Sequence, residues 1–343
     1  MARVGADGST KAALDQALHA ELSDDLDRGF AALDQSLAGR SGQQRNATRQ
    51  GDVEIMLPSI LWAQEETRFT LDFLDPLSRY YGTGVRVVDF RSESNEARDA
   101  INRWAETETD GTVDLLVPRG EVTDFTRFVV ASAGAVRAPW AVRFDPTDTR
   151  NAPFELLDGR SVDATTMHLR DAGTVRSASG DDWLAVELPY LGGELAMLML
   201  VPNAGEFDHI ASTVDADQVD SITGALVPRP LDLRVPRFQF SSVLNLDADL
   251  TTLGLGDAFS TQLADFSRIT GDESLAISDV VHGTYVAVDE EGTDGDAVTV
   301  VPSGDALTPG AAVVEINRPF LFFVRDTTSG LILQIGRVLE PQT

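Results

Sequence analysis

The amino-acid sequence predicts an α+β fold with large mixed β-sheets and with helices clustered in the N-terminal half. Three observations predict it. Near the N-terminus, apolar residues recur at helical spacing, as at Leu14, Leu18 and Leu22. Farther along, β-branched and aromatic runs of strand length are separated by Gly, Asp and Pro turns. No linker, internal repeat or low-complexity tract divides the 343 residues, so we expect one domain spanning 1–343.

The helices come first along the chain. Residues 1–10 have the pattern of a helix end closed by Gly8, with Ser9 or Thr10 as the N-cap of the next helix. Four further segments place apolar residues on one helical face. These expected helices are 10–22, 25–37, 68–81 and 95–107.

Strands dominate the rest of the sequence. Residues 125–136 are β-prone and largely apolar, as expected for a central strand that is buried on both faces. The other expected strands are 53–62, 164–170, 183–189, 195–202, 231–240, 281–288 and the apolar run 317–324.

The stretch between the expected strands 281–288 and 317–324 is rich in Gly and Pro and has no helical period. We expect it to be an exposed loop outside the sheets. Loops of this length are uncommon in compact domains and are usually functional. Its first half nevertheless alternates like a strand, because Thr293, Gly295 and Ala297 are small and uncharged whereas Asp294 and Asp296 are acidic. Inside a sheet, the first set would face a core and both carboxylates would face water. We therefore expect that the residues of this stretch are arranged for pairing within a sheet, a conformation that the intact loop has not adopted.

Several motifs resemble those of the serpin family of serine protease inhibitors. Glu290, Glu291, Gly292 and Thr293, followed by small residues, are similar to the serpin hinge. Segments 317–320 and 331–339 are similar to the serpin C-terminal signature, and 101–104, 154–159 and 187–190 match further motifs in the same order. The resemblance covers nearly the whole chain and implies the serpin fold, with a reactive-centre loop at about 290–316. It begins partway through the second helix of the family, so we expect the first helix, a core strand and the start of the second helix to be missing.

The resemblance also implies where a protease would cut. The family's usual spacing from Glu290 places the cleaved bond at Ala306–Leu307, with Asp305 or Leu307 as alternative bait residues. A small alanine suits the shallow pockets of elastase-like or subtilisin-like serine proteases, which are the expected partners. The implied hinge consists of Glu290, Glu291, Gly292, Thr293, Asp294, Gly295, Asp296 and Ala297.

Two further pairs match serpin positions around the opening of the main sheet. Arg237 and Glu290 are expected to meet above Trp140 and to hold the sheet shut, the alternative being an ordinary surface pair. His282 matches the histidine of the serpin shutter, the alternative being a buried structural imidazole. Ser132 stands where the family usually has asparagine, so the resemblance leaves the shutter network open.

The resemblance implies a suicide inhibitor and not an enzyme. A serine protease would cleave the loop through an acyl-enzyme and be trapped when the hinge enters the main sheet. The alternative is a non-inhibitory serpin-like binding protein, such as a carrier or chaperone, which the missing N-terminal elements and Ser132 favour. The sequence has no Gly-x-Ser-x-Gly motif, so we assign no catalytic residue.

The charge balance is strongly acidic. Asp and Glu number 55 against 27 basic residues, of which only Lys11 is a lysine, and the formal net charge is −28. Such a carboxylate-rich, lysine-poor composition is typical of proteins from salt-loaded cells, where screening weakens self-repulsion. The alternative is an acidic protein of an ordinary cell.

Composition also excludes several classes of partner. The acidic charge argues against nucleic acid, and there are no cysteines for disulfides or thiol chemistry. His19, His168 and His209 are too scattered for a metal site, and the acidic run 289–296 lacks the spacing of a calcium loop. We expect no cofactor, no membrane segment and a monomer. An extracellular location is favoured over a cytoplasmic one, since a secretion signal could precede the residues given.

Overall fold

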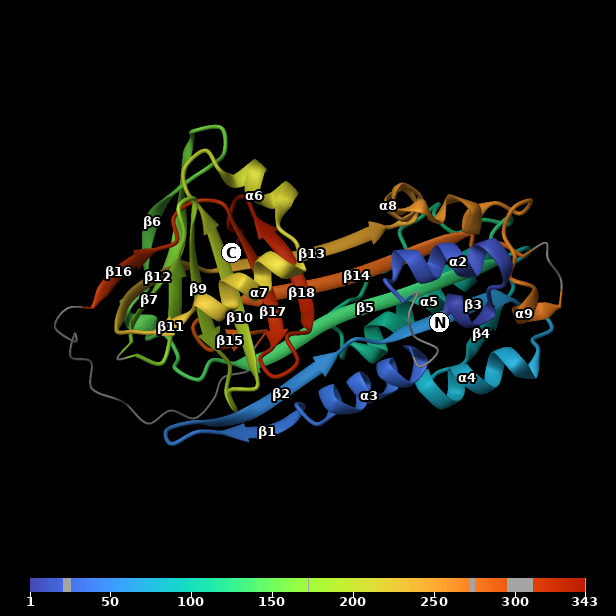
Figure 1. Cartoon of the computed structure of the whole chain (residues 1–343), viewed down its shortest axis with the longest axis horizontal. Coiled ribbons are helices and arrows are strands. Elements are labelled where there is room, and N and C mark those ends of the chain that lie inside the picture. Colours follow the sequence, from blue (N-terminus) through green and yellow to red (C-terminus); the bar gives the residue numbers. More distant parts are fainter. Residues whose placement is uncertain (21–25, 172, 272–274, 295–310, 343) are drawn as a thin grey trace. The chain divides into compact units, whose positions relative to one another are not determined.

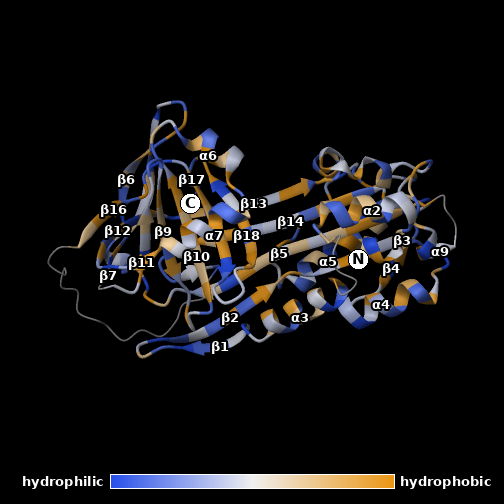
Figure 2. Cartoon of the chain, viewed as in Figure 1, coloured by the Kyte–Doolittle hydropathy of each residue, from blue (hydrophilic) through white to orange (hydrophobic). Residues whose placement is uncertain are grey.

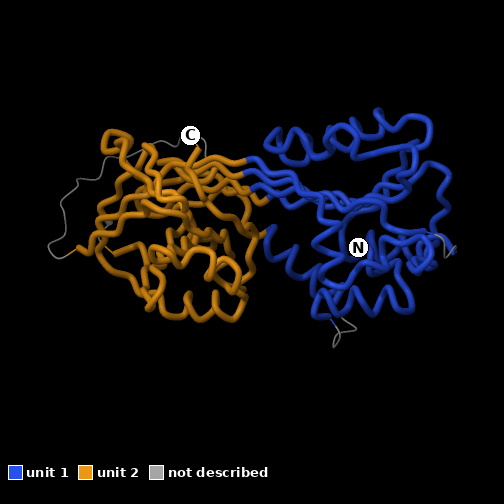
Figure 3. Tube along the Cα trace, turned by 90° about the horizontal axis from the view of Figure 1, so that it is seen from above, with its two compact units in different colours: residues 1–38, 56–135, 241–285 blue, residues 39–55, 136–240, 286–343 orange. Residues whose placement is uncertain are grey.

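The computed structural model describes residues 1–20, 26–171, 173–271, 275–294 and 311–342 (Figure 1). The chain forms two compact units, each assembled from segments that are distant in sequence (Figure 3). Unit 1 contains residues 1–38, 56–135 and 241–285, and unit 2 contains residues 39–55, 136–240 and 286–343.

Unit 1 holds most of the helices. Its longest ones are amphipathic, and in Figure 2 helix α4 shows both hydrophobic and hydrophilic residues along its turns. Thr70 caps this helix by accepting a hydrogen bond from the amide of Phe73, and Gly82 ends it in the left-handed conformation, with φ 59°. The helices of unit 1 are α1 (Ala2–Gly5), α2 (Gly8–Ala17), α3 (Leu26–Ala38), α4 (Leu71–Tyr81), α5 (Ser94–Glu108), α8 (Asp247–Leu250) and α9 (Ser267–Thr270), with the short turns η2 (Thr251–Leu255) and η3 (Gly256–Phe259).

The predicted boundary at the N-terminus is wrong. Gly8 does not close a helix but begins α2, and Asp7, rather than Ser9 or Thr10, is the N-cap. The hydroxyl of Thr10 is buried and accepts a hydrogen bond from the amide of Asp265 at 2.9 Å, so it is unavailable as a cap. Helix α2 also ends at Ala17, before the predicted end at residue 22.

Two cores support the strands of unit 1. One surrounds Phe73 and Phe128, and the other lies under α5, where Trp62 and Trp104 meet edge to face at 6.4 Å. The predicted strand 53–62 is in fact two strands, interrupted by Pro58, which has no N–H to donate to a ladder. These are β2 (Gln50–Met56) and β3 (Ser59–Gln64), and β4 (Val85–Val88) pairs parallel with β3.

Strands β5 (Phe128–Pro139) and β14 (Asp279–Val288) contribute residues to both units. Within unit 1 they pair in parallel, with Ser132 opposite His282. Because β5 also pairs antiparallel with β3, the sheet contains both parallel and antiparallel pairs, as predicted. The glycine at Gly283 is needed by packing, because a Cβ there would lie 2.8 Å from the Leu116 side chain.

Unit 2 contains two further sheets, of six and four strands. All eight residues of the central strand β10 (Leu195–Pro202) are buried, and this strand coincides with the predicted run 195–202. The six-stranded sheet has the order β11 (Val227–Pro228), β8 (Arg176–Ser179), β9 (Trp183–Pro189), β10, β17 (Phe320–Asp326), β18 (Ile332–Val338). The four-stranded sheet has the order β16 (Ala312–Glu315), β12 (Leu231–Pro236), β7 (Ser161–Asp171), β6 (Arg150–Glu155). The remaining elements are β1 (Gly42–Arg45), β13 (Phe238–Asn245), β15 (Gly292–Thr293), α6 (Phe207–Thr213), α7 (Ala216–Ala225) and η1 (Pro146–Asp148).

Two predicted segments of unit 2 need correction. The run 231–240 is two strands, because β12 pairs with β7 and β16 whereas β13 joins the sheet of β14. Arg237 lies between the two strands, and its amide continues the pairing with β7 by donating to the Thr165 carbonyl. The expected loop 290–316 contains strand β16, which pairs parallel with β12 and buries Val314. No helix in the described part of the chain is long and apolar enough to cross a membrane.

Candidate functional site: the hinge and its arginine contacts

Two of the hinge residues already lie inside a sheet. Gly292 and Thr293 form β15, which pairs with Pro139 and Ala138 of β5 on one side and with Val288 of β14 on the other. The sequence analysis expected this stretch to remain outside the sheets, and for these two residues that expectation is wrong.

A tight turn explains the early entry of the hinge into the sheet. The Asp289 carboxylate accepts hydrogen bonds from the amides of Glu291 at 2.8 Å and Gly292 at 3.2 Å. The amide of Asp289 in turn donates to the Gly292 carbonyl at 3.1 Å. An aspartate that bonds the backbone two residues ahead favours such turns, so the chain reverses directly after β14.

Both residues of β15 fit closely between their neighbours. A Cβ on Gly292 would lie 2.2 Å from the Ala138 carbonyl oxygen, so only glycine can approach β5 this closely. Thr293 is fully buried, and its hydroxyl lies 2.5 Å from that of Tyr190. Asp294 points the other way and accepts from Arg137 Nε at 3.0 Å. The alternation inferred from the sequence therefore holds at these positions.

Two stacked aromatic rings lie beneath the turn. Trp140 and Tyr190 are both fully buried and stack at 4.6 Å with an interplanar angle of 7°. The Trp140 indole donates to the Asp289 carbonyl at 2.9 Å, and its backbone amide donates to the Glu291 carbonyl at 2.8 Å. Burial raises the pKa of Tyr190, so its hydroxyl stays protonated beside Thr293.

The structure brings Arg237 and Glu290 together. The guanidinium contacts both carboxylate oxygens, at 2.6 Å and 3.0 Å, and Thr149 donates a further hydrogen bond to Glu290. The Glu290 side chain is only 4% exposed, whereas that of Arg237 is 38% exposed. Burial alone would raise the pKa of Glu290, but the bonds from Arg237 and Thr149 outweigh it, so the pKa is lowered.

Glu290→Gln is expected to lower the free energy of unfolding by about 1–3 kcal/mol at pH 7, because it leaves Arg237 without its counter-charge. The lowered pKa means that the pair contributes fully above the ordinary value of 4.5 and is lost as the pH falls through the folded value. Urea denaturation at pH 7 and in acid measures this difference. Glu155→Gln, at an exposed position, is the control. An equal loss at both pH values would contradict the assignment.

Glu291 is held by two arginines that the sequence analysis did not single out. Arg49 Nη2 lies 2.8 Å from one carboxylate oxygen and Arg143 Nη1 lies 2.9 Å from the other. Arg49 is largely buried and also donates to the Trp140 carbonyl at 2.7 Å. Each described acidic residue of the hinge thus has an arginine partner. Spacing in the sequence could not have selected these partners, because all basic residues but one are arginines.

Ser132 and His282 meet within unit 1. The serine Oγ lies 2.7 Å from the imidazole Nδ1, across the parallel pairing of β5 and β14. Burial lowers the pKa of His282, which favours the neutral imidazole near neutral pH. The serine thus provides a hydrogen-bonding partner where the resemblance left one open.

Some predicted site residues lie outside the described part of the chain. These are Gly295, Asp296, Ala297, Ala306 and Leu307. Among the described residues, no group of three or more His, Asp or Glu side chains is arranged to hold a metal ion.

These observations define a protein in which the residues after β14 turn back and add the short strand β15 between β14 and β5. The model of the serpin (serine protease inhibitor) family matches residues 1–341. An uncharacterised serpin-like protein of Thermococcus kodakarensis is 32% identical over all of this chain and 78% of its own length. The leukocyte elastase inhibitor A of Mus musculus is 28% identical over 99% of this chain and 89% of its own length. The chain therefore belongs to the serpin family.

Solved structures show the same fold. Uncleaved ovalbumin superposes with a TM-score of 0.85 at 23% identity, covering 99% of this chain and 89% of ovalbumin. At that identity, the likeness shows the fold alone. The expected serpin fold with mixed helices and large sheets is thus confirmed.

Proposed function

We propose that the protein is a suicide inhibitor of serine proteases, cleaved near Ala306–Leu307. The observation that carries this proposal is the position of Gly292 and Thr293 between β5 and β14. The intact protein thereby holds the start of the strand that a cleaved loop would complete. Relatives named as leukocyte elastase inhibitors support the choice of protease inhibition.

The proposed mechanism converts loop cleavage into strand insertion. A protease binds the extended loop and forms an acyl-enzyme with it. The hinge then extends β15 by pairing with both neighbours, and small inward residues such as Thr293 allow it to pack. The attached protease is carried away, and a displacement of about 1 Å within its active site is enough to slow deacylation about 10²-fold. The intact form is kinetically trapped short of this more stable state.

The bait residue limits the target class. Ala306 offers a small side chain, which suits a shallow apolar specificity pocket of an elastase-like or subtilisin-like enzyme. We therefore choose subtilisin as the test enzyme.

Incubation with subtilisin is expected to give a complex that survives SDS, together with cleavage within residues 304–308. Because the net charge of −28 favours the fold at high ionic strength, the incubation is made in multimolar salt. Gel electrophoresis detects the complex, and mass spectrometry maps the cut. Subtilisin inactivated at its serine is the control, since it cannot form an acyl-enzyme. Clean cleavage without a complex would instead support a non-inhibitory binding protein, and a cut elsewhere would overturn the bait assignment.

A further inference from the structure

A cavity of about 460 Å³ in unit 1 gathers three arginines around it. Arg68 precedes α4, Arg91 follows β4 and Arg127 precedes β5, so three separate segments supply the cations. Glu66 is the one carboxylate among the lining side chains in the described part of the chain. Among the described lining side chains, arginines therefore outnumber carboxylates, in contrast to the chain as a whole with its net charge of −28.

Within the described residues, two of the three arginines form no ion pair with a carboxylate. Arg68 is exposed and forms no ion pair within the described residues. Arg91 lies 3.2 Å from Glu66, but both side chains are more than half exposed, and such pairs are weak. Arg127 donates from Nη1 to the carbonyls of Asp124 and Thr126, which are neutral acceptors. Two guanidinium charges therefore have no carboxylate partner in the described part of the chain.

The cavity is built on fixed elements. Gln64 is 4% exposed, and its amide is held by the Asp89 carboxylate at 3.1 Å and by the backbone amide of Phe90 at 3.0 Å. The backbone amide of Arg127 donates to the Ser278 hydroxyl at 2.9 Å. The backbone around Gln64 and Arg127 is thus anchored, which lowers the cost of ordering this side of the cavity around a ligand.

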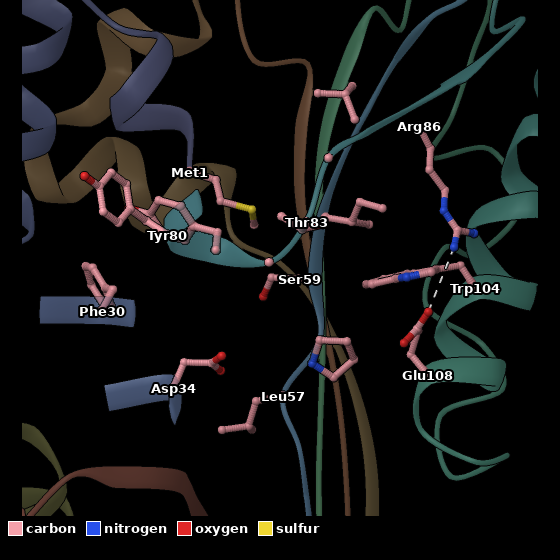
Figure 4. A pocket seen from close by; sticks show the side chains of 16 residues that line it. Met1, Phe30, Asp34, Leu57, Ser59, Tyr80, Thr83, Arg86, Trp104 and Glu108 are labelled. Carbon is pink, nitrogen blue, oxygen red and sulfur yellow. Dashed lines mark ion pairs between the residues drawn. The ribbon is translucent and has the colours of Figure 1, made fainter. Parts of the chain in front are cut away.

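Another cavity of unit 1 differs from this one in the charge of the side chains that line it. Its volume is about 570 Å³, and Arg86 is the one cationic side chain that lines it in the described part of the chain. Figure 4 shows Arg86 directed toward Glu108, with which it forms an ion pair at 3.9 Å, and Asp34 adds a second carboxylate. That cavity is therefore not cationic.

We propose that the cavity of Arg68, Arg91 and Arg127 binds the phosphate or sulfate group of a small molecule. Guanidinium groups match such oxyanions with paired, charge-assisted hydrogen bonds. The cavity volume falls in the range of small-molecule pockets, so it accommodates more than the oxyanion itself. Long polyanions are disfavoured, because the rest of the surface would repel them.

The test is titration with inorganic phosphate at fixed ionic strength, followed by ³¹P NMR. We expect saturable binding of one phosphate per chain, weakened about tenfold or more by Arg68→Gln. Arg68 is exposed and unpaired within the described residues, so this substitution leaves the fold intact. Arg79→Gln is the matched control, because it removes one charge from the same unit at an exposed position whose partner is Asp75.

Three ligands distinguish the sources of the oxyanion. Inorganic phosphate and glucose 6-phosphate are followed directly, and sulfate is measured by its displacement of bound phosphate. Tighter binding of the sugar phosphate identifies a phosphorylated small molecule as the ligand, and tighter binding of sulfate identifies a sulfated one. Binding that does not saturate, or that Arg79→Gln weakens as much as Arg68→Gln does, would overturn the proposal. The titration uses no protease, so its outcome is independent of the proposed inhibition.

Discussion

Thr293→Arg is expected to abolish the trapping of protease while leaving cleavage of the loop intact. Thr293 is fully buried between β5 and β14 and bonds to Tyr190, so an arginine would bring a charge into a closed site at a cost of several kcal/mol. The chain avoids that cost by withdrawing β15 from the sheet. The strand then has no starting pair, and the acyl-enzyme hydrolyses before insertion. The moles of inhibitor consumed per mole of subtilisin inactivated measure the effect.

Thr293→Ser is the control, because it keeps the hydroxyl beside Tyr190 and is no larger. It should retain most of the trapping. If Thr293→Arg formed the SDS-resistant complex at the ratio of the unchanged protein, entry of Thr293 into the sheet could not be part of the mechanism.

Cleavage of the loop is expected to raise the melting temperature by on the order of 10–20 °C in high salt. Insertion of about ten residues as a strand adds roughly ten ladder hydrogen bonds at about 1 kcal/mol each, and each kcal/mol shifts Tm by about 2 °C in a domain of this size. Differential scanning calorimetry of intact and nicked protein measures the change.

The same comparison on Thr293→Arg separates insertion from other effects of cleavage. Nicked Thr293→Arg should melt close to its intact form, because its strand cannot enter. An unchanged melting temperature for the nicked unaltered protein would show that no energy is stored in the intact state, and the proposed inhibition would fail with it.

Elements governed by local pattern were predicted well. The strands 183–189 and 195–202 match β9 and β10 in full, since each is an apolar run bounded by turn residues. Helices 68–81 and 95–107 match α4 and α5 to within three residues, because amphipathic spacing defines their buried faces.

Elements that depend on tertiary contacts were predicted less well. The alternation at β15 does not tell whether the intact chain places it in a sheet, and this two-residue strand forms because β5 and β14 leave a place for it. The break between β12 and β13 at Arg237 likewise depends on distant partners, because β12 pairs with β7 and β16 whereas β13 joins the sheet of β14.

The contacts of the candidate site also divide into those that the sequence indicated and those that only the structure reveals. Family resemblance placed Arg237 with Glu290, and the structure brings this pair into contact. It left the partner of His282 open, and the structure places Ser132 beside that imidazole. Arg49, Arg143 and Tyr190 were given no role, because their partners are fixed by the three-dimensional packing of the turn. Among so many arginines, only coordinates distinguish the ones that contact Glu291.

The presence of β15 in the intact protein also bears on how fast trapping can be. Starting a strand is the slow step of pairing, since a free segment loses much conformational entropy for its first bonds, whereas adding neighbours is cheaper. On the proposed mechanism, Gly292 and Thr293 have completed that start before any protease arrives. Whether insertion outruns deacylation would then depend on how readily β5 and β14 separate ahead of the growing strand. Substitutions at the paired residues of β5 and β14 should therefore change the rate of trapping more than changes in loop length do.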